Sequence, residues 1–94
     1  MIFVIMIYDI QTESNTHGNM LKLGRKYLHH IQKSCFHGYL SYKKVGKLEK
    51  ELEKILTPED HVIIYKMTAN KYLDIQEFGL EKTIDLGDFG VKKI

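Results

Sequence analysis

The sequence predicts an α+β sandwich, in which two helices cover one face of an antiparallel four-stranded sheet. Short apolar segments rich in Ile, Val and Tyr alternate with two longer segments of helical spacing, and the first apolar segment has no polar face. With 94 residues, 44% apolar and 28% charged, the chain has the composition of one small folded domain. That composition, with one Pro and one Cys, excludes a disordered tail, a collagenous chain and a disulfide-rich scaffold.

Residues 1–8 are predicted to form a strand because they are apolar, rich in Ile and too few for most helices. Both faces of this strand are apolar, which favours a central strand covered on both sides. Asp9 follows at the carboxyl end and continues one of these faces. The two faces consist of Ile2, Val4 and Met6, and of Phe3, Ile5 and Ile7.

A helix is predicted over residues 17–32, where apolar side chains recur three and four residues apart. Gly24 lies inside this segment and costs about 1 kcal/mol relative to Ala, so we expect a close packing contact there. A second strand is predicted over residues 34–42, with Gly38 marking a bulge or a close approach.

A second helix is predicted over residues 43–56, with Ser41 as its cap and apolar side chains on one stripe. Strands over residues 60–67 and 71–78 follow, and the tail is expected to add a looser strand. This order is that of the ferredoxin-like sandwich.

In that arrangement we expect the strands over residues 1–8 and 60–67 in the centre of the sheet. Residues 1–80 then form the ferredoxin-like domain, and residues 81–94 form a C-terminal tail or extra strand of the same domain. Because two helices on one face leave the other face bare, the two-sided first strand predicts a symmetric homodimer through the sheet face. The tail strand would extend a sheet edge of its own chain or of the partner.

The net charge of +2 hides an uneven distribution, which is −2 over residues 1–16, +6 over residues 17–54 and −2 over residues 55–94. A basic middle suits a protein that holds an anionic polymer, although charge alone favours a solvated helix face. Salt-dependent binding of nucleic acid by such a face is the alternative. The basic residues that we assign to it are Lys22, Arg25, Lys26 and Lys33.

Asp9 is the first candidate for chemistry, because a carboxylate at the end of a central strand can bind Mg²⁺ and two copies could converge in a dimer. On this residue alone, hydrogen bonding to turn amides is the simpler interpretation. His37 lies near Ser34 and could act as a general base, with an exposed strand residue as the simpler interpretation. Core packing is expected for Phe36.

Four segments in order carry a resemblance to a known family: Tyr8-Asp9-Ile10, Arg25, residues 32–38 (Gln-Lys-Ser-Cys-Phe-His-Gly) and residues 60–65 (Asp-His-Val-Ile-Ile-Tyr). They resemble CRISPR-associated protein two, the small partner of the CRISPR integrase. The resemblance implies a ferredoxin-like homodimer that bridges two integrase dimers and holds duplex DNA during spacer acquisition, in antiviral defence. It also implies a Mg²⁺-dependent endonuclease (a hydrolase) acting on single-stranded RNA or double-stranded DNA.

The same resemblance implies roles for individual residues. Asp9 would bind the metal across the dimer and act in catalysis, Arg25 would lie on the nucleic-acid side, and Tyr8, Ser34 and Phe36 would lie near the dimer cleft. The chain departs from the family pattern at Cys35 and His37, where Val and an acidic residue are common, and it lacks early arginines over residues 12–19.

Two other functions remain open at this point. One is a toxin-like ribonuclease similar to virulence-associated protein D, which would act without an integrase. The other is a regulatory ferredoxin-like dimer that binds a small molecule. The apolar N-terminal run lacks the features of a signal peptide, and no segment approaches the ~20 apolar residues of a membrane helix, so we expect a cytoplasmic protein with no membrane partner.

Overall fold

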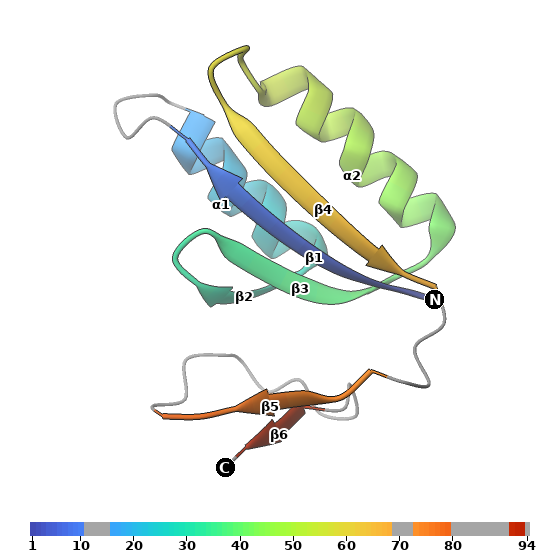
Figure 1. Ribbon diagram of the computed structural model, residues 1–94. Helices are drawn as coiled ribbons and strands as arrows, with labels where there is room; N and C mark the ends of the chain where they lie inside the picture. Colours follow the sequence, from blue (N-terminus) through green and yellow to red (C-terminus); the bar gives the residue numbers. More distant parts are fainter. Residues whose placement is uncertain (11–15, 69–72, 80–90, 94) are drawn as a thin grey trace.

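A computed structural model describes residues 1–10, 16–68, 73–79 and 91–93 of the chain, which are coloured in Figure 1. Two helices, α1 and α2, alternate with strands in the order β1-α1-β2-β3-α2-β4-β5-β6. The bounds are β1 Ile2–Asp9, α1 Thr16–Tyr27, β2 His29–Gln32, β3 Cys35–Leu40, α2 Tyr42–Ile55, β4 His61–Met67, β5 Ile75–Glu77 and β6 Val91–Lys93.

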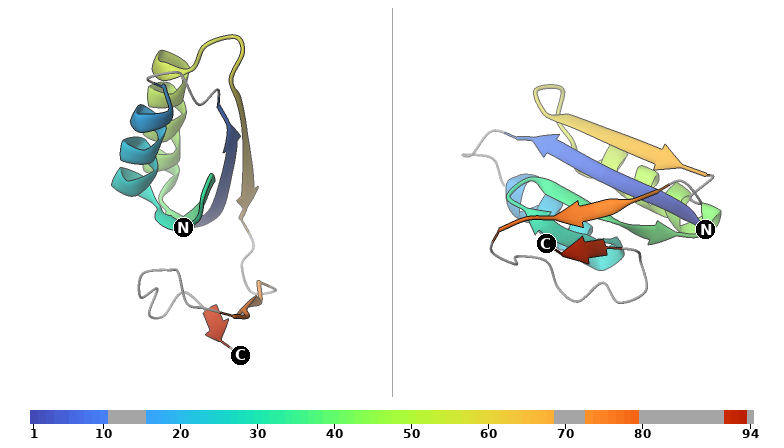
Figure 2. Two further views of the ribbon diagram at one scale, coloured as in Figure 1. Left: turned by 90° about the vertical axis from the view of Figure 1, so that its left-hand side faces the viewer. Right: turned by 60° about the horizontal axis from the view of Figure 1, so that its bottom comes forward.

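The main sheet has four antiparallel strands in the order β2-β3-β1-β4. Both helices lie on one side of this sheet, and its other side carries no helix in the described residues (Figure 2). The predicted α+β sandwich with both helices on one face is therefore confirmed. Neither of the helices in the described ranges is long and apolar enough to cross a membrane.

The core lies between the helices and the sheet, and β1 supplies alternate side chains to it as the pattern predicts. Ile2, Val4, Met6 and Tyr8 are all buried on the helix side. Gly24 lies against the ring of Phe36, where an added Cβ would come within 2.5 Å of ring atoms. The close packing contact expected at Gly24 is therefore confirmed, and it lets α1 approach β3.

The predicted helix over residues 17–32 is too long, because α1 ends at Tyr27 and His29–Gln32 forms β2. The amide of Leu28 still donates to the carbonyl of Gly24, at 2.7 Å, and the chain then turns into a hairpin with β3. The His30 ring stacks on Phe36 with centroids 4.5 Å apart. Although the spacing of these residues fits a helix, hydrogen bonding to β3 makes them a strand.

The predicted strand positions also need correction. The strand over residues 60–67, expected in the centre, is the edge strand β4, and β3 takes the central place beside β1. The segment predicted as a strand over residues 71–78 does not join the main sheet; its described part contains β5, which pairs in parallel with β6. The expected extra C-terminal strand is β6, but it pairs with β5 and not with an edge of the main sheet. Residues 80–90 of the tail lie outside the described ranges.

The second helix begins as predicted. The Ser41 side chain accepts a hydrogen bond from the amide of Lys44, at 3.2 Å, which satisfies one of the free donors of the first turn. Its apolar stripe of Val45, Leu48 and Leu52 is buried against the sheet. The rest of the helix surface is polar.

The open face of the sheet is apolar but only partly covered. Phe3 is 2% exposed, between the rings of His37 and Tyr39 at centroid distances of 5.3 and 5.1 Å. Towards the other end of β1 and along β4 the apolar side chains reach solvent. These exposed residues are Ile7, Ile63, Tyr65 and Met67.

Candidate functional site

Asp9 is the last residue of β1, and it is exposed on the open face of the sheet. Strand alternation places it on the same face as Ile7, and the antiparallel register sets it opposite His61 of β4. The carboxylate therefore sits at one end of the exposed apolar strip. This is the position that the sequence predicts for it.

One described chain does not build a complete metal site around Asp9. No group of three or more His, Cys, Asp or Glu side chains in the described ranges comes together to hold an ion. The nearby carboxylate of Asp60 is occupied, since it accepts bonds from the Thr57 amide at 2.8 Å and the Thr57 hydroxyl at 2.9 Å. A hard cation at Asp9 would take its other ligands from water or from a second chain, which suits Mg²⁺ because it retains several waters.

Tyr8 and Phe36, which the family resemblance places near the dimer cleft, lie in the core instead, and the core packing that we expected for Phe36 is confirmed. Tyr8 is 3% exposed and Phe36 is fully buried, both on the helix side of the sheet. Their rings stack at a centroid distance of 6.2 Å, and His17 meets Tyr8 edge-on at 6.1 Å. Burial raises the pKa of Tyr8, with Ser34 and Arg25 opposing that effect, and the hydroxyl lacks a partner in hydrogen-bonding geometry among the described residues. Both rings therefore pack in the core between the sheet and the helices, on the face of β1 opposite Asp9.

Ser34 and Cys35 lie close to the carboxyl end of β1. The amide of Tyr8 donates to the carbonyl of Ser34 at 3.0 Å, which brings Ser34 beside the residue that precedes Asp9. Cys35 pairs with Ile7 in the register of β1 and β3. Cys35 is half-buried, and burial raises the pKa of its thiol, so the thiol stays protonated and unreactive near neutral pH.

His37 is far from Asp9 and is not the exposed strand residue that we expected. It pairs with Ile5, four positions back along β1, so about 13 Å separates it from Asp9 at strand spacing. It is 7% exposed. Burial and, to a smaller extent, the nearby His29 lower the pKa of His37 to about 4, against the opposing effect of Glu77. His37 is thus a neutral, buried side chain, and its geometry does not support a general base beside Asp9.

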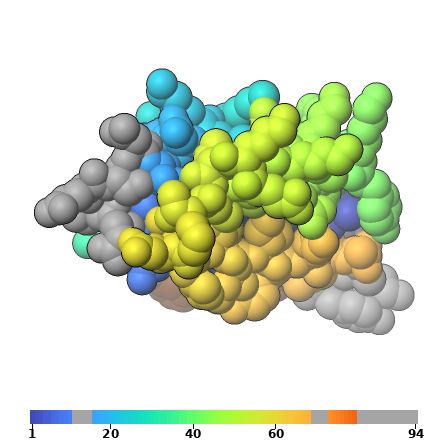
Figure 3. All heavy atoms as spheres, turned by 90° about the horizontal axis from the view of Figure 1, so that it is seen from above, coloured from blue at the N-terminus to red at the C-terminus, as the bar shows by residue number. Residues whose placement is uncertain are grey.

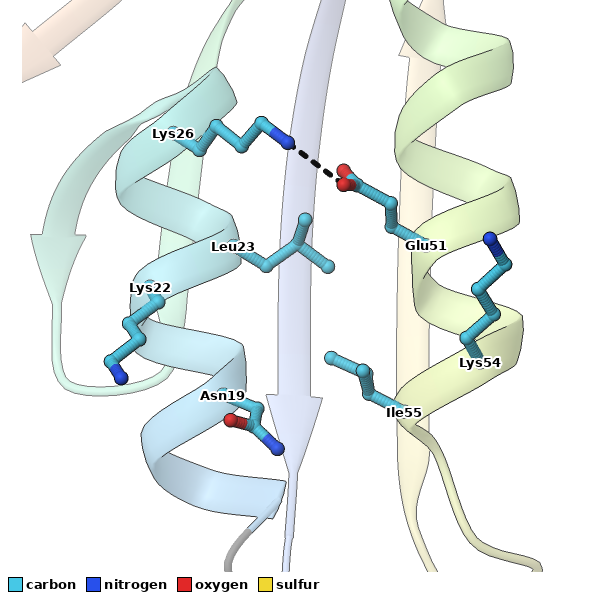
Figure 4. A pocket seen from close by; sticks show the side chains of 7 residues that line it. All are labelled: Asn19, Lys22, Leu23, Lys26, Glu51, Lys54 and Ile55. Atoms are coloured by element: carbon cyan, nitrogen blue, oxygen red, sulfur yellow. Dashed lines mark hydrogen bonds and ion pairs between the residues drawn. The ribbon is translucent and has the colours of Figure 1, made fainter.

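The four predicted nucleic-acid contacts are all exposed, but they do not form one patch. Lys22 and Lys26 line a hollow between α1 and α2 (Figure 4). Arg25 is near Tyr8, where its charge opposes the rise in the pKa of the Tyr8 hydroxyl. Lys33 lies in the turn between β2 and β3. The carbonyl of Lys33 accepts a hydrogen bond from the His30 ring at 2.7 Å, which fixes that turn.

Lys26 meets Glu51 of α2 across the interhelical space, with Nζ 2.8 Å from Oε1. This hydrogen bond lowers the pKa of Glu51 and raises that of Lys26. The same region of α2 carries several lysines that our sequence analysis did not assign to a site. These lysines are spaced three and four residues apart, which indicates one surface of a helix. The sequence did not show that this surface borders a hollow beside α1.

Comparison with known proteins identifies the family. The family described as CRISPR associated protein Cas2 matches residues 1–75. A protein of Dictyoglomus turgidum named CRISPR-associated endoribonuclease Cas2 is 38% identical over 81 residues, which cover 85% of this chain and 91% of that one. A protein of the same name from Thermotoga maritima is 36% identical over 84 residues, covering 88% and 94% of the two chains.

Solved structures agree with this match. A crystal structure of Cas2 is similar with a TM-score of 0.73 and 33% identity, over 86% of this chain and 90% of that one. The hypothetical protein TT1823 from Thermus thermophilus has a TM-score of 0.71, covers 85% and 93% of the two chains, and at 20% identity supports the fold alone. The sequence match and the shared fold, together with the strand end that carries Asp9, agree with the resemblance noted in the sequence. This chain belongs to the Cas2 family of CRISPR-associated proteins.

Proposed function

We propose that this protein is a Mg²⁺-dependent endonuclease and DNA-holding adaptor of CRISPR adaptation, active as a homodimer through its open sheet face. The observation that carries the proposal is the exposed apolar strip on that face, which ends at the carboxylate of Asp9. A second copy laid on this strip would bury it and supply a second Asp9. The relatives from Dictyoglomus turgidum and Thermotoga maritima are named endoribonucleases, which supports the nuclease part.

The residues around Asp9 have defined tasks in this proposal. Asp9 from each chain holds the cation, and the bound cation would lower the pKa of a water and polarise a phosphodiester. Ser34 lies at the adjoining strand end, where its carbonyl holds the backbone of Tyr8, and in this proposal it supports the strand end that presents Asp9. Arg25 and Lys33 are exposed cations that position the nucleic-acid backbone beside it.

Cleavage of single-stranded RNA and of duplex DNA with Mg²⁺ tests the catalytic part. We expect Asp9→Asn to abolish cleavage while the variant remains dimeric and binds duplex DNA. Glu59→Gln, which changes an exposed carboxylate in the turn before β4, is the matched control and should cleave like the parent. If Asp9→Asn cleaves as fast as the parent, Asp9 does not hold the metal.

Mixing separates a shared site from two independent sites. A 1:1 mixture of parent and Asp9→Asn, after subunit exchange, contains about one quarter parent dimers. If both carboxylates are needed, the mixture has about a quarter of the activity of parent alone at the same total protein concentration. An activity of about one half would mean that each chain cleaves alone, and would contradict the shared site.

The adaptor role distinguishes this proposal from a toxin-like ribonuclease. We expect the dimer to co-elute with the CRISPR integrase of its own host, and Asp9→Asn to do so equally well. A protein that cleaves RNA but forms no complex with the integrase would favour the toxin-like alternative. A cytoplasmic location belongs to the same proposal, since the protein would have to meet the integrase and its DNA in one compartment.

A further inference from the structure

The strongest charged surface outside the Asp9 region is the groove between α1 and α2. We propose that this groove binds the phosphate backbone of duplex DNA through lysines of α2, on the layer of the molecule opposite Asp9. The inference rests on the DNA-holding part of the proposed function and assigns it to residues that the sequence patterns did not. The argument starts from the distribution of charge around α2.

Charge on α2 is segregated into two flanks. At 100° per residue, Glu49 and Glu53 fall on one side of the buried stripe and Lys44 falls on the other. Lys47, Lys50 and Lys54 follow Lys44 around the part of the helix surface that faces away from the stripe, and these four residues form the lysine flank. The acidic flank faces β4, since Glu49 pairs with Lys66 at 3.7 Å. The lysine flank faces α1, and in Figure 3 the side chains of α2 extend away from β4 towards the side where α1 lies.

The lysine flank borders a real depression in the surface. A hollow of about 500 Å³ is lined by the basic side chains Lys26, Lys44, Lys47, Lys50 and Lys54, with Glu51 as its acidic residue. A second hollow of about 390 Å³, whose lining is drawn in Figure 4, shares Lys26, Glu51 and Lys54 with the first. The two hollows are therefore parts of one groove. The Lys26–Glu51 pair crosses the groove where the two hollows meet.

The lysines of this groove are available to a ligand. Within the described part of the chain, Lys44, Lys47, Lys50 and Lys54 form no ion pair, and only Lys26 is engaged, by Glu51. Like charges three and four residues apart on a helix repel one another, and an anionic ligand would remove that cost. Five lysines around one glutamate therefore form a surface that favours a polyanion.

The spacing of the lysines fits a nucleic-acid backbone. Lys44 and Lys54 are ten residues apart, which is about 15 Å along the helix axis. One DNA strand advances about 3.4 Å per phosphate, so this length matches about four phosphates. Lysines act as mobile point charges, so the expected binding is independent of sequence and steeply dependent on salt.

The location of the groove also separates holding from cleavage. The helices lie on one side of the main sheet (Figure 2). Strand alternation from the exposed Ile7 places Asp9 on the other side. In a dimer formed through the open faces, both grooves would remain on the outside. DNA held there would not need to enter the Asp9 region.

Binding of a random 20-base-pair duplex, measured by fluorescence anisotropy in EDTA at several salt concentrations, tests the inference. We expect Lys47→Gln and Lys50→Gln each to weaken binding about fivefold at 0.15 M salt, and the double variant to weaken it about 30-fold. The slope of log K against log salt should fall by about two in the double variant. Lys66→Gln, with the same loss of one charge on the β4 side, should bind like the parent.

A gain of affinity provides a readout that misfolding cannot imitate. Glu51→Gln removes the acidic residue of the groove and releases Lys26, so we expect about fivefold tighter binding at 0.15 M salt. Glu53→Gln makes the same change of charge on the opposite flank of the same helix and should leave affinity unchanged. Equal gains in both variants would indicate general charge attraction and would overturn the groove assignment.

The remaining outcomes distinguish this inference from the proposed function. If the parent binds duplex and the double lysine variant binds it equally well, the groove is not the site, while DNA holding through other residues stands. If the parent binds no duplex, the DNA-holding role and the groove both fail. If the double variant loses affinity for single-stranded RNA but not for duplex, the ligand is RNA and the duplex assignment is wrong.

Discussion

On the helix-covered face of the sheet, alternate side chains of β1 from Ile2 to Tyr8 are no more than 3% exposed. On the open face of the same strand, exposure rises from 2% at Phe3 to 41% at Ile7. Both faces of β1 are equally apolar in sequence, so they differ only in what covers them. This chain buries the helix face of β1 along its whole length. On the open face it buries the end at Phe3 and leaves the end towards Asp9 exposed to solvent.

The contrast suggests how a short chain could carry the two functions that we propose for it. The face that is finished within the chain has a charged outer layer, and its helices present lysines to solvent. The unfinished face keeps its apolar side chains and its candidate catalytic carboxylate exposed, ready for a second copy. Stability should therefore depend on the helix side, and assembly on the open side.

The largest expected effect is on the helix side. Phe36→Ala should lower the free energy of unfolding by about 3–5 kcal/mol, because the ring is fully buried against Gly24, Tyr8 and His30. Urea unfolding at a fixed protein concentration measures it. Tyr65→Ala, on the open face and 55% exposed, is the comparison and should change monomer stability by less than about 1 kcal/mol. Equal losses would mean that the two faces are alike.

His37 predicts a loss of stability in mild acid. Its pKa is lowered to about 4 in the folded chain, below the ordinary value of 6.5, mainly by burial. Between pH 6.5 and pH 4 the unfolded chain therefore binds more protons, and stability falls as pH falls through this window. At pH 4 this effect lowers the free energy of unfolding by about 3 kcal/mol relative to neutral pH, and above pH 6.5 it is absent.

Comparing the parent with His37→Leu isolates this contribution from other titrating groups. The difference between the two unfolding free energies should change across pH 6.5 to 4 and be constant above it. His29 and Glu77, which both act on the pKa of His37, remain in the variant. A difference independent of pH would contradict a buried neutral His37.

Two glycines in helices give a smaller, opposite pair of effects. Gly24→Ala should destabilise the protein by about 1–3 kcal/mol, because a Cβ would meet the buried Phe36 ring at 2.5 Å. Gly46→Ala, with open space at the same position, should stabilise by about 0.5–1 kcal/mol through helix propensity. Thermal unfolding of both variants checks the signs, and a stabilising Gly24→Ala would show that α1 can move away from β3.

Patterns along one segment were sufficient for part of this molecule. Strand alternation correctly predicted which side chains of β1 face the core and that Asp9 continues the other face. The Ser41 cap and the buried stripe of α2 were equally local signals. Contacts between segments were predictable at two glycines, Gly24 inside a helix and Gly38 inside a strand, and both lie where another segment approaches closely.

Features that depend on pairing between segments were not predictable in this way. Residues 29–32 have helical spacing, and only their hydrogen bonding to β3 makes them a strand. The sequence of β4 is as apolar as that of a central strand. It is nevertheless an edge strand, because it pairs with β1 on one side and with no other strand of the main sheet. The α2 lysines likewise border a groove only because α1 packs beside them, so their proposed role was not visible in the sequence.

The mass of the protein in solution tests the central claim, that a second copy completes the open face. For the 11.0 kDa chain we expect light scattering to give twice that mass for the parent. Tyr65→Lys, which places a charge in the exposed strip, should give the mass of one chain with its helical content intact. A parent of 11.0 kDa at micromolar concentration, or a Tyr65→Lys variant that stays dimeric, would contradict the account.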